Sequence, residues 1–238
     1  MRCAWESLSA GAYRCRLPFL DVTVGLVAGP AGVLLIDCGT TLAEASDIAA
    51  DVRELTGRTV TDVVMTHHHF DHILGSGGFP DARLHASAAV AKALSDGRAG
   101  LRSDALSFHA GEADVDAALA CLRVPDRVVV TDARIDLGDR VVAVEHPGRG
   151  HTDHDLVVVV PASKAGEPPV VFCGDLIEES GDPAVDAGSD LSAWPAAVDR
   201  LIELGGPDAR YVPGHGAVVD AQFLRSQRDW LVRRLREA

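Results

Sequence analysis

An apolar segment that runs directly into a cluster of histidines restricts the fold of this chain more than any other feature. The segment from Val60 to Met65 is rich in β-branched residues, which is typical of a buried strand. The next seven residues, 66–72, read THHHFDH and contain an HxHxDH arrangement. In extended backbone, residues two apart project to the same side, so His67 and His69 can contact one ion. The turn that follows directs Asp71 and His72 toward a neighbouring ion, and the segment therefore predicts a site for two metal ions at the end of a strand.

Three more candidate ligands occur later in the chain, and each follows a strand or a glycine. His151 follows two nearby glycines, Asp175 follows an apolar strand and a glycine, and His215 lies within the tight-turn sequence PGHG. Each alone would more often be structural, but their order and loop contexts favour metal binding, because a strand gives rigidity and glycine allows close approach. Imidazole nitrogen and carboxylate oxygen suit zinc, with iron and manganese as alternatives.

The remaining pattern indicates one α/β domain over residues 1–238. A capping box of Thr41 and Glu44 opens an amphipathic helix over 42–56 that ends at Gly57. Strands precede helices in both halves of the chain, which suggests two sheets covered by helices on their outer faces. We expect strands at 22–27, 33–36, 60–65, 83–85, 127–131, 141–145, 156–160 and 170–173, and helices near 86–95, 113–122, 191–204 and 219–236. The poorly patterned, glycine-containing stretch 97–112 is expected to form a loop over the site.

Composition argues against several classes of partner. The 238-residue chain has a formal charge of −13, with 35 acidic against 22 basic residues, and this disfavours nucleic acid. No stretch approaches the roughly 20 apolar residues needed to span a bilayer, and no export signal is visible, so we expect a cytoplasmic protein without membrane contact. The five cysteines form no CxxC pair and are read as free thiols in or near the core. A small-molecule substrate is the expected partner, and the sequence is compatible with a homodimer.

The ordered motifs resemble those of the metallo-β-lactamase-fold hydrolases, and span Asp37 to His215. The resemblance implies an α/β fold of the four-layer αββα sandwich type, with the site at one edge between the sheets. It implies a non-ligand, structural role for Asp37, and an aspartate at 175 resembles the thioesterase and lactonase branches, as in glyoxalase II-like enzymes. The implied ligands are His67, His69 and His151 for a first metal, Asp71, His72 and His215 for a second, and Asp175 as a bridge between them.

The resemblance implies a metal-dependent hydrolase with two zinc ions per chain. Two divalent ions lower the pKa of a bridging water, so that hydroxide attacks a thioester, lactone, amide or similar bond. Asp71 is the predicted catalytic residue that orients this water and handles its proton, while His154, Arg149 and Tyr211 are candidates for contacting substrate. We expect Asp37, Asp153 or Asp155 to fix the imidazole tautomers. The competing hypothesis is a persulfide dioxygenase-like oxidoreductase with a single iron, and a β-lactamase or a metal-binding module without catalysis is less favoured.

Overall fold

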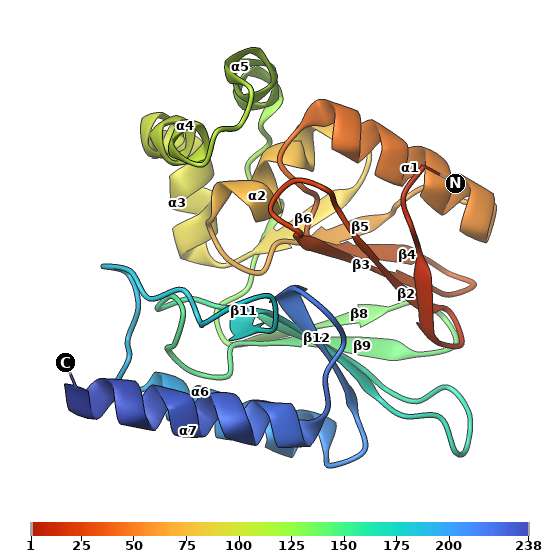
Figure 1. The fold of residues 1–238 in the computed structure, drawn as a ribbon. Coiled ribbons are helices and arrows are strands. Elements are labelled where there is room, and N and C mark those ends of the chain that lie inside the picture. Colours follow the sequence, from red (N-terminus) through yellow and green to blue (C-terminus); the bar gives the residue numbers. More distant parts are fainter. Residues whose placement is uncertain (1, 238) are drawn as a thin grey trace.

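The structure is a computed structural model that describes residues 2–237 and consists of four layers (Figure 1). The first sheet contains, in spatial order, β1 (Glu6–Ser9), β2 (Ala12–Arg16), β3 (Thr23–Ala28), β4 (Val33–Ile36), β5 (Asp62–Val64), β6 (Arg83–Ala86) and β7 (Arg127–Val128). The second contains β12 (Arg210–His215), β11 (Val170–Glu178), β10 (Val157–Val160), β9 (Val141–Glu145) and β8 (Asp132–Asp136).

Helices cover the outer face of each sheet (Figure 1). The first sheet carries α1 (Leu42–Thr56), α2 (Phe70–Ile73), the short 3₁₀ helix η1 (Leu74–Gly78), α3 (Ala88–Asp96), α4 (Arg98–Ser107) and α5 (Glu112–Cys121). The second sheet carries α6 (Trp194–Gly205) and α7 (Ala221–Glu237). This arrangement confirms the predicted αββα sandwich. None of the helices in the described part of the chain is long and apolar enough to cross a membrane.

Local signals account for the first helix. The Thr41 side chain accepts a hydrogen bond from the Glu44 amide while the Glu44 carboxylate binds back to the start of the helix, so the predicted capping box is present. Gly57 ends the helix in the left-handed conformation, at φ 69°. The apolar side chains that α1 buries recur at helical spacing: Ala45, Ile48 and Val52.

The two sheets pack face to face through branched aliphatic side chains. Leu34 and Val64 of the first sheet share one apolar cluster with Val158 and Phe172 of the second. At Gly25 of β3 the sheets approach so closely that a Cβ atom would lie 2.4 Å from the Phe172 ring. This packing holds the end of β5 and the middle of β11 at the same edge of the sandwich, where the predicted ligands lie.

One expectation from the sequence is wrong: stretch 97–112 is not a loop. Residues Arg98–Ser107 form helix α4, which buries only Leu101 and Ala105. Two buried positions in ten residues give a weak helical pattern, and this explains why the helix was missed. The strand expected over 127–131 is also shorter, at Arg127–Val128.

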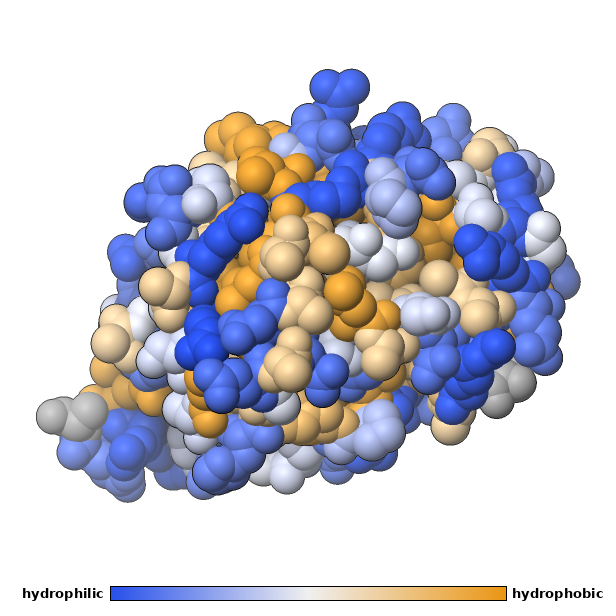
Figure 2. Space-filling view, turned by 90° about the horizontal axis from the view of Figure 1, so that it is seen from above, coloured by the Kyte–Doolittle hydropathy of each residue, from blue (hydrophilic) through white to orange (hydrophobic). Residues whose placement is uncertain are grey.

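The helical face over the first sheet is mostly hydrophilic, with apolar residues showing in patches between the polar ones (Figure 2). Phe108, which follows α4, is 55% exposed. Its ring lies 5.7 Å, centre to centre, from that of Phe70 in α2. Helix α4 therefore places an accessible aromatic ring beside the short helix that carries Asp71.

Candidate metal centre

A break in strand β11 turns Asp175 toward the histidine cluster. Gly174 adopts φ 53°, and the pairing of β11 with β12 shifts register between Phe172 and Gly174. A side chain at 174 would crowd Thr66, because its Cβ would lie 3.1 Å from that side chain. Strand alternation does not hold across this break, so Cys173 points into the apolar core as expected for a structural thiol. The glycine thus lets β11 present a carboxylate to the end of β5.

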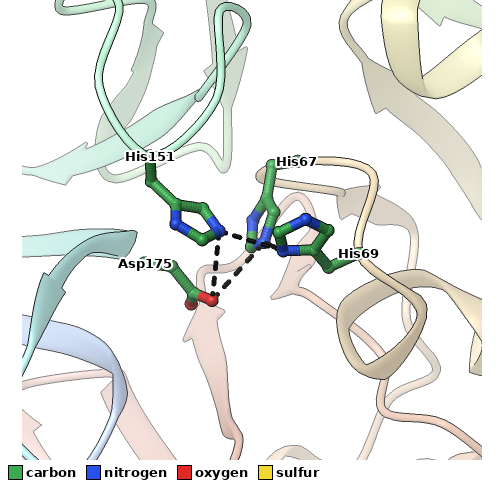
Figure 3. Close-up of side chains that lie close together, drawn as sticks. All are labelled: His67, His69, His151 and Asp175. Atoms are coloured by element: carbon green, nitrogen blue, oxygen red, sulfur yellow. Dashed lines mark hydrogen bonds and ion pairs between the residues drawn. The ribbon is translucent and has the colours of Figure 1, made fainter. Parts of the chain in front are cut away.

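The first group of predicted ligands converges on one point (Figure 3). The His69 Nδ1 atom lies 3.1 Å from His67 Nε2 and 2.9 Å from His151 Nε2. The Asp175 Oδ2 atom lies 3.5 Å from His67 Nε2 and 3.6 Å from His151 Nε2. Four side chains from three separate segments therefore offer one atom each at spacings that could hold a metal ion.

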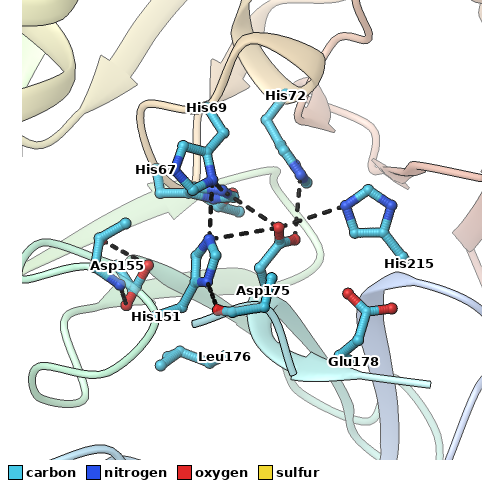
Figure 4. A network of polar contacts seen from close by, with 12 residues as sticks. His67, His69, His72, His151, Asp155, Asp175, Leu176, Glu178 and His215 are labelled. Carbon is cyan, nitrogen blue, oxygen red and sulfur yellow. Dashed lines mark hydrogen bonds and ion pairs between the residues drawn. The ribbon is translucent and has the colours of Figure 1, made fainter. Parts of the chain in front are cut away.

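The second group lies directly beside the first, as the positions of His72 and His215 show (Figure 4). Its members are Asp71, His72 and His215, and the His215 Nε2 atom lies 3.4 Å from Asp71 Oδ2. Asp175 faces this group too, with Oδ1 3.1 Å from His72 Nε2 and Oδ2 3.4 Å from His215 Nε2. A single carboxylate therefore lies between the two groups, and all seven predicted ligand side chains converge.

Asp37 fixes the tautomers of two imidazoles, one in each group. Its Oδ2 atom accepts from His72 Nδ1 at 2.8 Å and from the Thr66 hydroxyl at 2.9 Å. Because that hydroxyl gives its only proton to Asp37, it must accept from His67 Nδ1, which lies 2.9 Å away. In their neutral form both imidazoles then carry their proton on Nδ1 and direct a bare Nε2 lone pair into the centre. The predicted role of Asp37 beside the ligands agrees with these contacts.

Main-chain carbonyl groups fix two further imidazoles. His151 Nδ1 donates to the Ala184 carbonyl at 3.1 Å, and His215 Nδ1 donates to the Leu20 carbonyl at 2.8 Å. When neutral, both therefore direct Nε2 lone pairs inward. His69 is reversed: its Nδ1 faces the other imidazoles, while its Nε2 lies 3.5 Å from Asp186 Oδ2. Sequence reasoning missed Ala184, Leu20 and Asp186.

This donor set fits divalent cations. Several imidazole lone pairs and two carboxylates face one another in a buried space, an arrangement that is repulsive unless protons or cations lie between them. Among the described residues, the buried atoms His72 Nε2 and Asp175 Oδ1 face each other at 3.1 Å, but neither makes a hydrogen bond of normal geometry. Buried polar atoms without a partner are costly in a folded protein, and metal coordination would satisfy both.

In the absence of a cation, the two groups of predicted ligands differ in the pKa values of their histidines. Burial lowers the pKa of His67 well below its usual value. Burial also acts against a charged His215, but the Asp175 carboxylate outweighs it and raises the pKa of His215 to about 9. The pKa of His72 is likewise raised despite burial, chiefly by Asp175. In turn, His72 and His215 hold the pKa of Asp175 well below its usual range although burial opposes this. The second group therefore binds protons where it would otherwise bind a cation.

The candidates for contacting substrate are placed differently from one another. The His154 Nε2 atom lies 3.0 Å from His68 Nδ1, next to the first group, and its Nδ1 donates to Asp153 at 2.7 Å. The Arg149 side chain is 59% exposed and pairs with Asp190 at 3.4 Å. Tyr211 is fully buried in the core beneath α6, which excludes the expected contact with substrate.

Two of the three aspartates expected to fix imidazole tautomers do not contact the predicted ligands through hydrogen bonds. Asp155 accepts from the amide and hydroxyl of Thr152, at 2.8 and 2.7 Å, and so closes the turn after His151. Asp153 binds His154 instead. Only Asp37 acts as expected, because it alone lies at the end of the strand beside β5.

Comparison with known proteins agrees with this geometry. The sequence model of the metallo-beta-lactamase superfamily matches residues 17–215. Metallo-beta-lactamase type 2 from Bacillus cereus is 23% identical over 202 residues, which cover 84% of this chain and 69% of that protein. A protein of the same name from Bacillus sp. (strain 170) is 23% identical over 204 residues, covering 84% and 68%.

Solved structures show the same fold. A metallo-beta-lactamase from Pontibacter korlensis superposes with a TM-score of 0.72 at 21% identity, covering 97% of this chain and 99% of that one. The metallo-beta-lactamase FIM-1 from Pseudomonas aeruginosa, in its mono-zinc form, gives 0.73 at 16% identity, covering 97% and 95%. The chain belongs to the metallo-beta-lactamase superfamily. It is accordingly a metal-dependent hydrolase, and its His and Asp groups could hold the metal.

Proposed function

We propose that the chain is a dinuclear zinc hydrolase that cleaves a thioester, lactone, amide or similar bond of a small molecule. The position of Asp175 carries the proposal. Its Oδ1 atom faces His72 at 3.1 Å, and its Oδ2 atom faces His67 at 3.5 Å and His215 at 3.4 Å. A carboxylate that faces two adjacent sets of nitrogen donors is suited to bridging two ions, and imidazole with carboxylate is a donor set that zinc favours.

Bound zinc would supply hydroxide at neutral pH and polarise the substrate oxygen. The chain's own residues orient this chemistry. Asp71 is only 5% exposed, and its Oδ2 atom lies 3.4 Å from His215 Nε2 and 3.7 Å from His72 Nε2. As a carboxylate it can only accept hydrogen bonds, so it is placed to orient the attacking water and to hold the proton that the water loses.

Three aromatic rings pack together around Phe70, the residue before Asp71, and we propose that they contact the apolar part of the substrate. The ring of Phe70 lies 6.5 Å from that of Phe19 and 5.7 Å from that of Phe108. These three aromatic residues come from the turn after β2, from α2 and from the end of α4. The relatives named metallo-beta-lactamases bring β-lactams, which are cyclic amides, into the set of substrates to be tested alongside thioesters and lactones.

Metal analysis combined with a substrate screen tests this proposal. We expect two zinc equivalents per chain, and hydrolysis of at least one thioester, lactone or β-lactam by the loaded protein. Asp71→Asn should lose turnover, whereas Asp81→Asn, at an exposed position, should retain it. A single iron with oxygen uptake and no hydrolysis would refute the proposal in favour of a persulfide dioxygenase-like reaction.

A further inference from the structure

The turn between β2 and β3 has an unusual backbone. Leu20 and Asp21 are consecutive and both left-handed, with φ of 54° and 59°. Turns with two positive φ values normally use glycine or asparagine, because a Cβ atom is disfavoured in this region. A branched residue such as Leu20 adopts it only where the surroundings impose it. Contacts made by the turn must therefore stabilise this conformation.

An ion pair holds the turn closed. Arg16, the last residue of β2, donates from Nε to Asp21 Oδ1 at 2.7 Å and from Nη2 to Asp21 Oδ2. This two-pronged geometry fixes direction as well as distance. The Leu17 amide also donates to the Val22 carbonyl at 2.9 Å. Side chain and main chain together thus fix the five residues between Arg16 and Val22.

The closed turn holds one predicted metal ligand in two ways. The Leu20 carbonyl accepts from His215 Nδ1 at 2.8 Å, and Val22 forms an antiparallel bridge with the His215 main chain. The direction of the Leu20 carbonyl depends on the two left-handed residues, since a right-handed Leu20 or Asp21 would rotate the peptide group between them. The strained conformation therefore aims an acceptor at His215.

We propose that Arg16 and Asp21 are positioning residues for metal binding by the second group, acting through the Leu20 carbonyl. With Nδ1 held as a donor, His215 keeps its Nε2 lone pair directed at the space shared with Asp71, 3.4 Å away. Opening the ion pair removes the side-chain restraint on the turn, and the tautomer and orientation of the imidazole are then less firmly held. This role rests on the proposed two-metal function, and it concerns affinity at one of the two groups.

Stepwise zinc titration with a competing chelator tests the proposal on the full chain. Arg16→Gln removes the two-pronged ion pair with Asp21. Asp21→Asn removes the charge of the carboxylate, while asparagine still tolerates the left-handed conformation. Arg102→Gln is the matched control, since Arg102 forms a similar two-pronged pair with Asp116 on helices α4 and α5. The zinc equivalent that His215→Ala loses defines the second group. The tautomer of His215 is read in parallel by nitrogen NMR of the metal-free protein at alkaline pH, where the imidazole is neutral.

We expect both turn variants to weaken the second equivalent about tenfold, or about 1.4 kcal/mol, and to leave the first unchanged. Cobalt bound as the second equivalent should show an altered absorption spectrum, and His215 should lose its Nδ1 proton preference. The proposal is overturned if both variants match Arg102→Gln in second-site affinity and tautomer, or if both equivalents weaken equally. Should the wild-type protein bind only one zinc, the two-metal function fails, while the tautomer comparison still decides the role of the turn.

Discussion

Replacing Asp37 by asparagine should move the ring proton of two imidazoles from Nδ1 to Nε2. The carboxylate accepts from the Thr66 amide at 2.8 Å, the Thr66 hydroxyl at 2.9 Å and His72 Nδ1 at 2.8 Å. The amide N–H of Thr66 can only donate, so the asparagine must place its oxygen there and its NH₂ group toward the other two partners. His72 Nδ1 then becomes an acceptor, and the Thr66 hydroxyl is free to donate to His67 Nδ1. Both imidazoles would carry their proton on Nε2, the atom that faces the metal centre.

The size of the effect follows from these contacts. Loss of one partner that fixes a ligand costs about 10- to 100-fold in metal affinity, or about 1.4 to 2.8 kcal/mol, and Asp37→Asn affects one ligand in each group. Both zinc equivalents should therefore weaken. Folding stability should also fall, by about 3 kcal/mol, because three hydrogen bonds to a charged acceptor become neutral ones that are each weaker by about 1 kcal/mol.

Asp62→Asn provides a control for the loss of stability. Asp62 is also a buried aspartate that accepts from a histidine, with His85 Nε2 at 2.8 Å, and it also binds Thr61 and Arg83. It lies at the other end of β5, so we expect a similar fall in the free energy of unfolding with normal zinc affinity. The assay is urea unfolding of the metal-free proteins together with chelator-competition titration. Wild-type zinc affinity in Asp37→Asn, or an equal loss in Asp62→Asn, would refute the tautomer argument.

Three further results are expected. His69→Ala and Asp71→Ala should each abolish turnover while circular dichroism shows a folded protein. Zinc binding should release a proton from His215, because its pKa of about 9 keeps it charged at neutral pH. Zinc affinity should therefore rise with pH until about pH 9. Over the same range the metal-free protein should lose the stability that it gains from the ion pair of charged His215 with Asp175. A flat affinity across that range would contradict this. Gly214→Ala should displace the bridging carboxylate and reduce zinc binding, because its Cβ would lie 1.8 Å from Asp175 Oδ1, whereas Gly100→Ala, with open space around it, should bind zinc normally in the same titration.

The sequence was most informative where local chemistry is decisive. The capping box and the apolar spacing of 42–56 act within one helix, and both appear in the structure. The seven predicted ligands converge because each follows a buried strand or a glycine turn at the same edge of the sandwich. The αββα order was predictable for a similar reason, since amphipathic helices must cover apolar sheets.

Contacts made through the main chain were not predictable. The partners of His151 and His215 are the carbonyl groups of Ala184 and Leu20, which lie 33 and 195 positions away in the sequence. Every residue has a carbonyl group, so residue type gives no signal for this role. Helix α4 was missed for a related reason: its position depends on packing against α2 and α5 more than on its own apolar pattern.

Each ligand group draws side chains from both halves of the chain. His67, His69, Asp71 and His72 follow β5 in the first sheet, whereas Asp175 and His215 lie in strands of the second sheet and His151 lies in the loop between β9 and β10. A bound ion would therefore cross-link the two sheets at their open edge, and would stabilise the fold as well as supply the chemistry. At a free zinc concentration of 100 times the dissociation constant, one such ion adds about 2.7 kcal/mol to the free energy of unfolding. Removal of the metal should therefore lower the free energy of unfolding as well as abolish turnover.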